Sequence, residues 1–415
     1  MGLAREIAEK AQKAQPQIAR ASSDKKNKIL QKIAEYLEEN IESILSANQK
    51  DLSNAEKNGA NKALLDRLKL DEKRVKALIK SVEEIIKLPD PVGQIIEMKP
   101  RPNGLLVGRM RIPLGVIATI YEARPGVTVD IASLCIKSGN AVILRGGSEA
   151  LETNSVLVQL IKKAIKDEGI DENIVGFIND PSREHIFELL KLEELIDLVI
   201  PRGGEGLIRF VAENSRVPVL KHYKGVCHIF VDEFADLEKA YRVCLNAKVQ
   251  RPSVCNAMET LLVHEKIAEK FLPTMGKIFR EHGVELRGCE KTRKIIPYAI
   301  PATEEDWYAE YLDLILAVKV VSSIDEAIEH IKKYGSSHTE AIITENLENA
   351  MKFIKEVDSS SVMVNASTRF ADGYEYGLGA EVGISTTKLH AYGPMGLEGL
   401  TTLKWIVFGN GHIRE

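Results

Sequence analysis

The sequence lacks long apolar runs, an excess of positive charge and a secretory signal. A membrane-spanning helix needs about 18 or more consecutive apolar residues, and the 415-residue chain contains no such run. Its net charge of −4 offers no basic surface to nucleic acid. The amino terminus is amphipathic and has no apolar signal core. We therefore expect a cytoplasmic protein that binds neither membrane nor nucleic acid.

The sequence also lacks the cysteine and histidine spacings of structural metal sites. Its five cysteines are scattered and form no C-x-x-C pair: Cys135, Cys227, Cys244, Cys255 and Cys289. This pattern argues against a disulfide framework and a zinc site. Five of its histidines likewise fall into no H-E-x-x-H spacing: His222, His228, His330, His338 and His390. We expect no metal.

What the chain does contain is the alternation of an α/β protein. Apolar residues recur at helical spacing over residues 1–88. A hairpin pattern follows around Pro102-Asn103-Gly104. From Pro113, apolar strand-like runs alternate with helical segments, and the alternation repeats from about Val226. This order predicts parallel sheets with helical crossovers in more than one domain.

Cys255 differs from the other cysteines in its surroundings. Pro252, Ser253 and Asn256 make its neighbourhood a turn, and an apolar strand-like run follows. Lys248 and Arg251 precede it, and positive charge favours the nucleophilic thiolate. The other cysteines lie in apolar stretches that predict core positions. From these residues alone, Cys255 is a candidate nucleophile or a small buried apolar residue.

Two Gly-Gly turns predict a nucleotide site. In "ILRGGSEA" (143–150) and "IPRGGEGLIRF" (200–210), a strand ends, two glycines follow and a helix begins. Such turns let backbone N–H groups approach phosphate, although the G-x-G-x-x-G pattern is absent. Arg145, at the carboxyl end of its strand, suits the 2′-phosphate of NADP. The alternative is a pair of ordinary βα turns.

Glu310 precedes the buried strand in "DWYAEYLDLILAVKVV". Its carboxylate is a candidate for a hydrogen bond to the nicotinamide ribose, or it is a solvated loop residue.

Several longer strings resemble one family when they are taken together and in order. They include "IYEARPGVTVDIASLCIKSGNAVILRGGSEA" (120–150), "VPVLKHYKGVCHIFVD" (217–232), "NAKVQRPSVCNAMETLLVH" (246–264) and "NASTRFADGYEYGLGAEVGISTTKLHAYGPMGLEGLTT" (365–402). Over nearly the whole chain, the sequence is similar to the gamma-glutamyl phosphate reductases, or glutamate-5-semialdehyde dehydrogenases, of the aldehyde dehydrogenase superfamily.

The resemblance implies an aldehyde dehydrogenase-like α/β fold with three parts. Residues 1–93 and 111–225 would form a Rossmann-type NADP(H)-binding domain, and residues 226–400 an α/β catalytic domain. Residues 94–110 and 401–415 would form an oligomerisation hairpin and a final strand. The resemblance thus implies a homo-oligomer, and it leaves open a contact with glutamate 5-kinase, which makes the labile substrate.

The resemblance also implies the reaction and the residues that carry it. NADPH would reduce L-glutamyl 5-phosphate to L-glutamate 5-semialdehyde with release of phosphate, the second step of proline biosynthesis. Cys255 matches the catalytic cysteine. Arg145, Ser148 and Gly203-Gly204 match cofactor-binding positions, and Glu310 matches the acidic residue that helps seat the nicotinamide ribose.

The chain departs from the superfamily pattern at positions that bear on the chemistry. Where hydrolytic aldehyde dehydrogenases have a water-activating glutamate, this chain has "LKHYKG" (220–225), and where they have an oxyanion-binding asparagine it has Glu122-Ala123. Tyr392 stands in "LHAYGP" where the reductases are expected to have arginine. Four other residues in the resembling motifs are therefore candidates for substrate binding: Arg124, Arg251, Asn256 and Arg369.

Three other functions fit parts of the pattern. The protein could be an acylating aldehyde dehydrogenase that uses another acyl phosphate or acyl-CoA. It could be a thiol hydrolase, although no Cys-His-Asn spacing supports that class. It could also be an inactive scaffold, against which Cys255 and both Gly-Gly turns argue.

Overall fold

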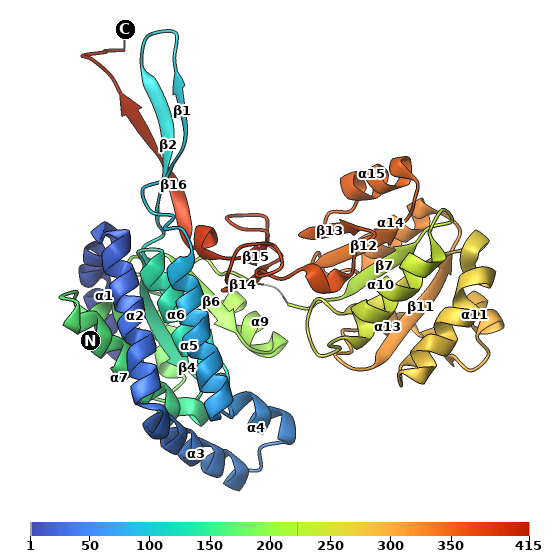
Figure 1. Cartoon of the computed structure of the whole chain (residues 1–415), viewed down its shortest axis with the longest axis horizontal. Helices are drawn as coiled ribbons and strands as arrows, with labels where there is room; N and C mark the ends of the chain where they lie inside the picture. Colours follow the sequence, from blue (N-terminus) through green and yellow to red (C-terminus); the bar gives the residue numbers. More distant parts are fainter. Residues whose placement is uncertain (1, 222, 415) are drawn as a thin grey trace. The chain divides into compact units, whose positions relative to one another are not determined.

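The computed structural model describes residues 2–221 and 223–414, which divide into two compact units. Unit 1 comprises Met1–Lys221, Gly377–Gly383 and Met395–Glu415, and unit 2 comprises His222–Tyr376 and Ile384–Pro394. Figure 1 colours the chain from blue at the amino terminus to red at the carboxyl terminus. Among the described residues, no helix combines the length and apolar character that a membrane crossing requires.

Unit 1 begins with a series of helices joined by short connections: α1 (Leu3–Arg20), α2 (Ser23–Glu39), α3 (Ile41–Lys57), α4 (Lys62–Leu68) and α5 (Glu72–Lys87). Ser22, Asn61 and Asp71 cap the starts of α2, α4 and α5 by accepting a backbone N–H three residues later. The helical periodicity of residues 1–88 therefore predicted this block correctly.

A four-stranded parallel sheet forms the centre of unit 1, in the order β5-β4-β3-β6. Its strands are β3 (Val116–Tyr121), β4 (Ala141–Gly146), β5 (Val175–Phe177) and β6 (Leu198–Arg202). The main helices that connect or follow them are α6 (Gly126–Lys137), α7 (Leu151–Asp167), α8 (Glu184–Leu189) and α9 (Glu205–Asn214). Short 3₁₀ turns precede α7 and β5, at η1 (Ser148–Ala150) and η2 (Glu172–Ile174).

The strand order of this sheet reverses at β3. The chain moves from β3 to β4 and β5 on one side and then crosses to β6 on the other. Every residue of β3 and β4 is buried, as their continuous apolar runs predict. In open α/β sheets, the carboxyl ends of the strands at such a reversal are the usual place for a ligand.

A three-stranded antiparallel sheet completes unit 1. It joins β1 (Ile95–Pro100), β2 (Leu106–Pro113) and β16 (Thr401–Phe408), with β2 in the middle. Figure 1 shows it standing away from the helices of the unit. Trp405 and Phe408 of β16 are more than half exposed, and both β1 and β16 are edge strands. Its part in oligomer formation stays a prediction.

The segment expected to be wholly catalytic, 226–400, contains two stretches that fold with unit 1, Gly377–Gly383 and residues 395–400. The short helix η4 (Leu397–Leu400) explains the second. The Leu400 carbonyl accepts hydrogen bonds from Asn140 Nδ2 at 2.8 Å and from the Leu114 backbone N–H at 3.3 Å. The short strands β14 (Gly383–Ser385) and β15 (Gly393–Met395) pair where the chain passes between units.

Unit 2 is built on a seven-stranded parallel sheet in the order β10-β9-β11-β8-β7-β12-β13. Its strands are β7 (Cys227–Val231), β8 (Met258–His264), β9 (Glu285–Gly288), β10 (Ile300–Pro301), β11 (Ile315–Val321), β12 (Thr339–Ile343) and β13 (Ser361–Val364). Its helices are α10 (Leu237–Val249), α11 (Glu265–Glu281), α12 (Glu290–Ile295), α13 (Glu304–Trp307), α14 (Ile324–Tyr334), α15 (Leu347–Glu356) and η3 (Thr368–Phe370).

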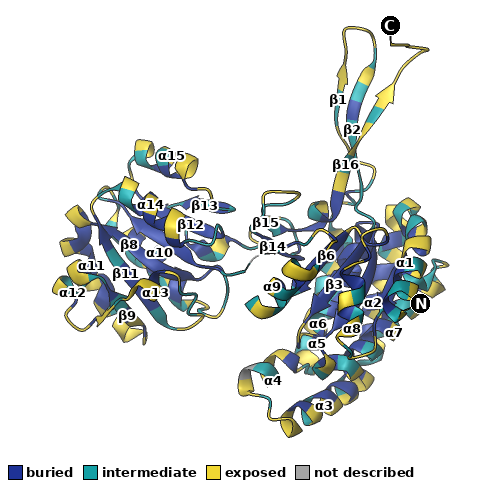
Figure 2. Cartoon of the chain, turned by 180° about the vertical axis from the view of Figure 1, so that it is seen from behind, coloured by how far each residue is buried: buried dark blue, intermediate teal, exposed yellow. Residues whose placement is uncertain are grey.

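Successive residues of the central strands point into two different cores. Leu261 and Val263 of β8 belong to a cluster with side chains of α10 and α11. Leu262 belongs to a second cluster, with side chains of α14 and α15. Figure 2 shows these strands as buried, with exposed surface on the helices around them. Both faces of the sheet are covered, so the loops at its edges are left to form a site.

Candidate active site

The predicted cofactor residues gather at the carboxyl edge of the unit 1 sheet. Arg145 is the penultimate residue of β4, and Ser148 begins η1 two residues after the strand ends at Gly146. Gly203 and Gly204 follow β6, which lies on the other side of β3. Because the three strands are parallel and adjacent, their carboxyl ends meet at one edge. The sheet therefore brings together residues that lie about 60 positions apart in the sequence.

Arg145 is buried, with one part of its guanidinium unsatisfied. Its Nη1 donates to the Gly146 carbonyl at 2.9 Å and its Nη2 to the Pro181 carbonyl at 2.8 Å. Its buried Nε has no hydrogen-bond partner, and burial lowers the pKa of the guanidinium. A buried N–H without a partner is costly. Its place at the strand end fits the phosphate-bearing end of a dinucleotide.

The Gly203-Gly204 turn is held by a carboxylate of the neighbouring strand end. Glu122 Oε2 accepts the Gly204 backbone N–H at 2.9 Å. A Cβ on Gly203 would lie 2.6 Å from the same carboxylate, so a side chain there would displace Glu122 from this contact. In the same way, Glu149 Oε1 accepts the Ala123 backbone N–H at 2.8 Å. These N–H groups are donors that suit an anionic ligand.

The predicted nucleophile, Cys255, lies at the amino edge of the unit 2 sheet. Cys255 is partly exposed, in the turn between α10 and β8. Two further loops reach the same amino edge, because Gly225 precedes β7 and Glu310 precedes β11. The strands β11, β8 and β7 are adjacent and parallel. The Cys255 turn is as predicted, and the sheet gives it two neighbours.

The backbone of Cys255 is tightly enclosed. A Cβ on Gly225 would fall 1.8 Å from the Cys255 carbonyl oxygen, so no other residue fits at this position without moving backbone. The Cys227 thiol donates to the same carbonyl at 3.2 Å. Burial raises the pKa of Cys227 well above its ordinary value, so this thiol stays protonated as a donor. Gly225 was not singled out from the sequence, where it ends the "LKHYKG" string.

Glu310 contacts Gly225, the residue that packs against the Cys255 backbone. Its Oε1 accepts the Gly225 backbone N–H at 2.8 Å. The structure thus places the predicted ribose-binding carboxylate on the residue that packs against Cys255. Its predicted contact with the cofactor stays a prediction.

Three of the four candidate substrate residues lie near Cys255. Asn256 is buried, donates to the Ala371 carbonyl at 3.0 Å and accepts a hydrogen bond from Arg369. Arg369 Nε also donates to Gln250 Oε1 at 2.8 Å. Burial and the nearby charge of Arg251 lower the pKa of Arg369. Two guanidinium groups beside a thiol form an anion-binding environment.

The fourth candidate, Arg124, belongs to unit 1, where it is exposed in the turn between β3 and α6. Tyr392, which replaces an expected arginine, belongs to unit 2, and its hydroxyl donates to the Asp358 carbonyl at 3.0 Å. Substrate binding by Arg124 stays a prediction, and this hydrogen bond assigns no substrate contact to Tyr392.

The expectation that Lys248 adds charge to the Cys255 turn is wrong. Lys248 lies in the last turn of α10 and is completely buried. Its Nζ forms an ion pair of 2.7 Å with Glu259 Oε2, which is also completely buried. The sequence placed Lys248 near a turn, but the helix continues to Val249 and turns this side chain inward.

The other cysteines are largely core residues, as predicted. Cys135, Cys227 and Cys244 are buried. Cys289 is only partly buried, because its sulfur caps α12 and accepts the Thr292 backbone N–H at 3.5 Å.

No group of three or more histidine, cysteine, aspartate or glutamate side chains within residues 2–221 and 223–414 is arranged to hold a metal ion. His222 lies outside the described residues. The buried His228 instead pairs with Glu340, with 3.0 Å between Nδ1 and Oε2.

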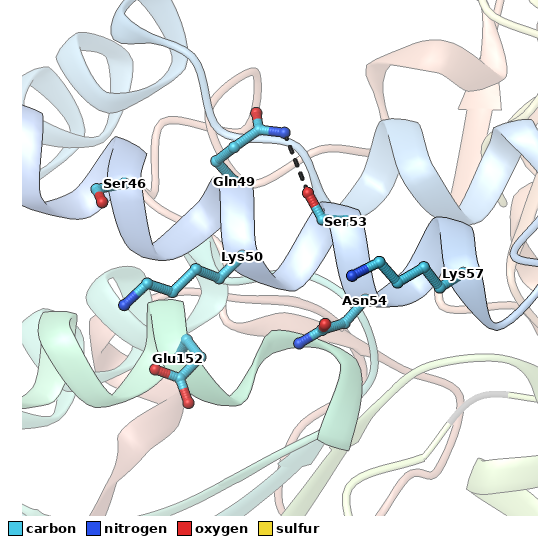
Figure 3. Close-up of a pocket in the computed structure, with 7 residues that line it drawn as sticks. All are labelled: Ser46, Gln49, Lys50, Ser53, Asn54, Lys57 and Glu152. Carbon is cyan, nitrogen blue, oxygen red and sulfur yellow. Dashed lines mark hydrogen bonds between the residues drawn. The ribbon is translucent and has the colours of Figure 1, made fainter.

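A separate polar groove of roughly 690 Å³ lies in unit 1, between α3 and the start of α7. Its lining residues are Ser46, Gln49, Lys50, Ser53, Asn54, Lys57 and Glu152. Figure 3 shows Lys50 reaching from α3 toward the segment that carries Glu152. The groove contains none of the predicted site residues.

Comparison with known proteins places this arrangement in a family. The aldehyde dehydrogenase family model matches residues 3–287. Gamma-glutamyl phosphate reductase of Thermodesulfovibrio yellowstonii is 62% identical over 398 residues, which cover 96% of this chain and 95% of that protein. The enzyme of the same name from Carboxydothermus hydrogenoformans is 57% identical, with 98% of each chain covered.

A solved structure agrees with these sequences. The crystal structure of gamma-glutamyl phosphate reductase from Thermotoga maritima matches with a TM-score of 0.98 and 52% identity, and all of both chains is covered. The fold class expected from the sequence is thereby confirmed. The chain belongs to the gamma-glutamyl phosphate reductases, oxidoreductases of the aldehyde dehydrogenase family.

Proposed function

We propose that the protein reduces L-glutamyl 5-phosphate to L-glutamate 5-semialdehyde and phosphate with NADPH, in the second step of proline biosynthesis. The observation that carries the proposal is the enclosure of Cys255. A partly exposed thiol meets Glu310 through Gly225 and has Arg251 and Arg369 beside it. The names of relatives that are 62% and 57% identical supply the substrate class.

In the proposed reaction, the Cys255 thiolate attacks the acyl carbon of the substrate. A carbon–sulfur bond forms, the bond to the phosphate oxygen breaks, and phosphate leaves with its electron pair. The product of this step is a thioester on Cys255. Arg251 and Arg369 would bind the anionic groups of the substrate, because guanidinium groups pair well with phosphate and carboxylate.

The cofactor residues fit a nicotinamide dinucleotide. The Arg145 Nε is buried without a partner, and the space beside Gly204 is open, since the nearest atom to a Cβ placed there would be Glu122 Oε2 at 3.9 Å. Arg145 and Ser148 would hold the adenosine end with its 2′-phosphate, and Glu310 the nicotinamide ribose. When bound, the cofactor supplies the hydride that reduces the thioester to the aldehyde and frees the thiolate.

The missing water-activating glutamate suits this chemistry. Residues 220–225 contain no carboxylate. An activated water would hydrolyse the thioester and waste the acyl group. The oxyanion formed during the reaction would be held by the Cys255 backbone N–H. Losing one donor of this kind typically costs about 10²–10³ in rate.

The proposal is tested in the reverse direction with glutamate 5-semialdehyde. The aldehyde is mixed with NADP⁺ and inorganic phosphate, and reduced cofactor is followed by absorbance. Parallel reactions replace NADP⁺ with NAD⁺, or phosphate with coenzyme A. We expect reduced cofactor to form only when phosphate is present, and to form faster from NADP⁺ than from NAD⁺. Turnover with coenzyme A but not with phosphate would instead identify an acyl-CoA reductase.

A further inference from the structure

The buried ion pair between Lys248 and Glu259 connects to the candidate active site through the turn that carries Glu310. Glu259 uses one carboxylate oxygen for Lys248, at 2.7 Å. Its other oxygen accepts the backbone N–H of Leu312 at 3.2 Å. Lys248 Nζ also lies 5.9 Å from the centre of the Tyr311 ring. The buried pair therefore interacts with two consecutive residues of this turn, Tyr311 and Leu312.

The turn needs such support because its backbone is strained. Leu312 has a φ of 53°, in the left-handed region that branched and bulky residues rarely adopt. A residue held there costs about 1–3 kcal/mol, and Leu312 is substantially exposed, so the core does not hold its side chain. A hydrogen bond from its N–H to a completely buried carboxylate is the kind of contact that keeps this conformation in place.

From this turn, a series of contacts leads to the nucleophile. Glu310, two residues before Leu312, accepts the Gly225 backbone N–H. Gly225 in turn packs against the Cys255 carbonyl, with no room for a side chain between them. Each contact is made by a backbone group or by a partly buried carboxylate. A shift of the turn would therefore be passed to the backbone of Cys255.

We infer that Glu259, held in place by Lys248, is a positioning residue that fixes the Glu310 turn and, through Gly225, the backbone of Cys255. Neither Glu259 nor Lys248 acts on the substrate itself. The expected effect on cofactor affinity rests on the proposed function of Glu310, whereas the effect on the geometry of Cys255 does not.

Two double variants isolate the Leu312 hydrogen bond. Lys248→Met with Glu259→Gln removes both buried charges but keeps a carbonyl acceptor for Leu312. Lys248→Met with Glu259→Leu removes the same charges and the acceptor. Replacing a buried ion pair by hydrophobic residues of similar volume is often neutral for stability, so the methionine–leucine variant should fold, and glutamine has nearly the shape of the glutamate that it replaces. Thermal melting verifies this for each protein.

Two readouts are compared in the full chain. The first is the rate at which iodoacetamide alkylates Cys255, measured by peptide mass spectrometry. The second is the pair of kinetic constants KM for NADPH and kcat, which separates a change in cofactor binding from a change in turnover. We expect the glutamine variant to stay within about twofold of the wild type. The leucine variant should differ by about fivefold in alkylation rate and by about tenfold in KM, in line with the loss of one hydrogen bond.

Equal alkylation rates in the two variants would overturn the inference. A difference in alkylation without measurable NADPH binding by the wild type would support it, while contradicting the proposed function. Hydrogen exchange in the wild type gives a check that needs no variant. The Leu312 amide should be strongly protected, and exchange at the rate of an exposed loop amide would also overturn the inference.

Discussion

The two sheets place their candidate residues at opposite edges. In unit 1, Arg145 lies in the last two residues of β4 and the Gly203-Gly204 turn follows β6, so both are at the carboxyl edge. In unit 2, Gly225, Cys255 and Glu310 precede theirs, at the amino edge. The carboxyl edge at a strand reversal is the usual ligand site of a parallel sheet. The amino edge has no such general role, so its geometry depends on specific contacts.

The two edges are also stabilised differently. At the unit 1 edge, carboxylates of the chain bond backbone N–H groups that suit an anion, as Glu122 does with Gly204. Glu122 and Gly204 are both exposed. At the unit 2 edge, the supporting ion pair of Lys248 and Glu259 is completely buried. The contact that holds the Gly204 turn is therefore open to solvent, whereas the ion pair beneath the unit 2 edge is closed to it.

Removing the sulfur should have the largest effect and should leave the unit 1 edge intact. Cys255→Ala is expected to lower the rate of aldehyde formation by roughly 10⁴-fold or more, the scale of losing a nucleophile. NADPH binding, followed by fluorescence titration, should be nearly unchanged. Cys289→Ser is the matched control, because serine keeps the cap of α12. Retained turnover in Cys255→Ala would contradict the nucleophile assignment.

Filling the space beside Cys255 should have the next largest effect. Gly225→Ala forces a methyl group into the Cys255 backbone, and displacing reacting groups by about 1 Å can cost 10²-fold in rate. We expect a loss of about 10² in kcat, measured with the aldehyde assay. Gly206→Ala is the control, because no atom lies within 4 Å of its added Cβ. Equal rates in the two variants would contradict the close packing of Gly225 against the Cys255 backbone.

A change at the unit 1 edge should be smaller and specific to one cofactor. Arg145→Leu removes the proposed partner of the 2′-phosphate. Hydrogen bonds to charged groups contribute about 1.5–3 kcal/mol, so the KM for NADPH should rise about 10- to 10²-fold. The KM for NADH, measured in the same variant, should change little. An equal rise for both cofactors would show that Arg145 does not read the 2′-phosphate.

A pH series tests the stability of unit 2 alone. His330 packs on His228 of β7, and burial, with the nearby charges of His228, Lys319 and Lys333, lowers its pKa to about 2. Below pH 6.5, the unfolded chain therefore binds a proton that the folded chain does not. Unit 2 should lose about 1.4 kcal/mol of stability per pH unit from this residue as the pH falls.

The chain has two tryptophans, and only Trp307 lies in unit 2. In a Trp405→Phe background, tryptophan fluorescence during urea unfolding thus reports on unit 2. Adding His330→Gln should flatten the pH dependence below 6.5 by the stated amount. Identical slopes with and without His330 would contradict the lowered pKa.

The sequence predicted most of the local features and few of the long-range contacts. The polar residues around Cys255 predicted its turn, and the Gly-Gly pairs predicted the strand-to-helix turns that meet at the unit 1 edge. The helical periodicity before residue 88 predicted the first block of helices. In each case, the signal lies within a few neighbouring residues.

The residues that fix the unit 2 edge gave no such signal. Glu259 lies within an apolar strand and Lys248 within the end of a helix, and only the packing of α10 on β8 buries them as a pair. The need for glycine at position 225 comes from a residue 30 positions later. Reading Lys248 as part of a charged turn failed for the same reason.

In the proposed reaction, Cys255 carries the acyl group as a thioester. This proposal is tested most directly by incubating the protein with glutamate 5-semialdehyde and NADP⁺ in phosphate-free buffer, followed by peptide mass spectrometry. We expect one NADPH to form per chain, a glutamyl adduct on the Cys255 peptide, and release of that adduct when phosphate is added. Formation of NADPH without an adduct on Cys255, or with an adduct on another residue, would contradict the proposal.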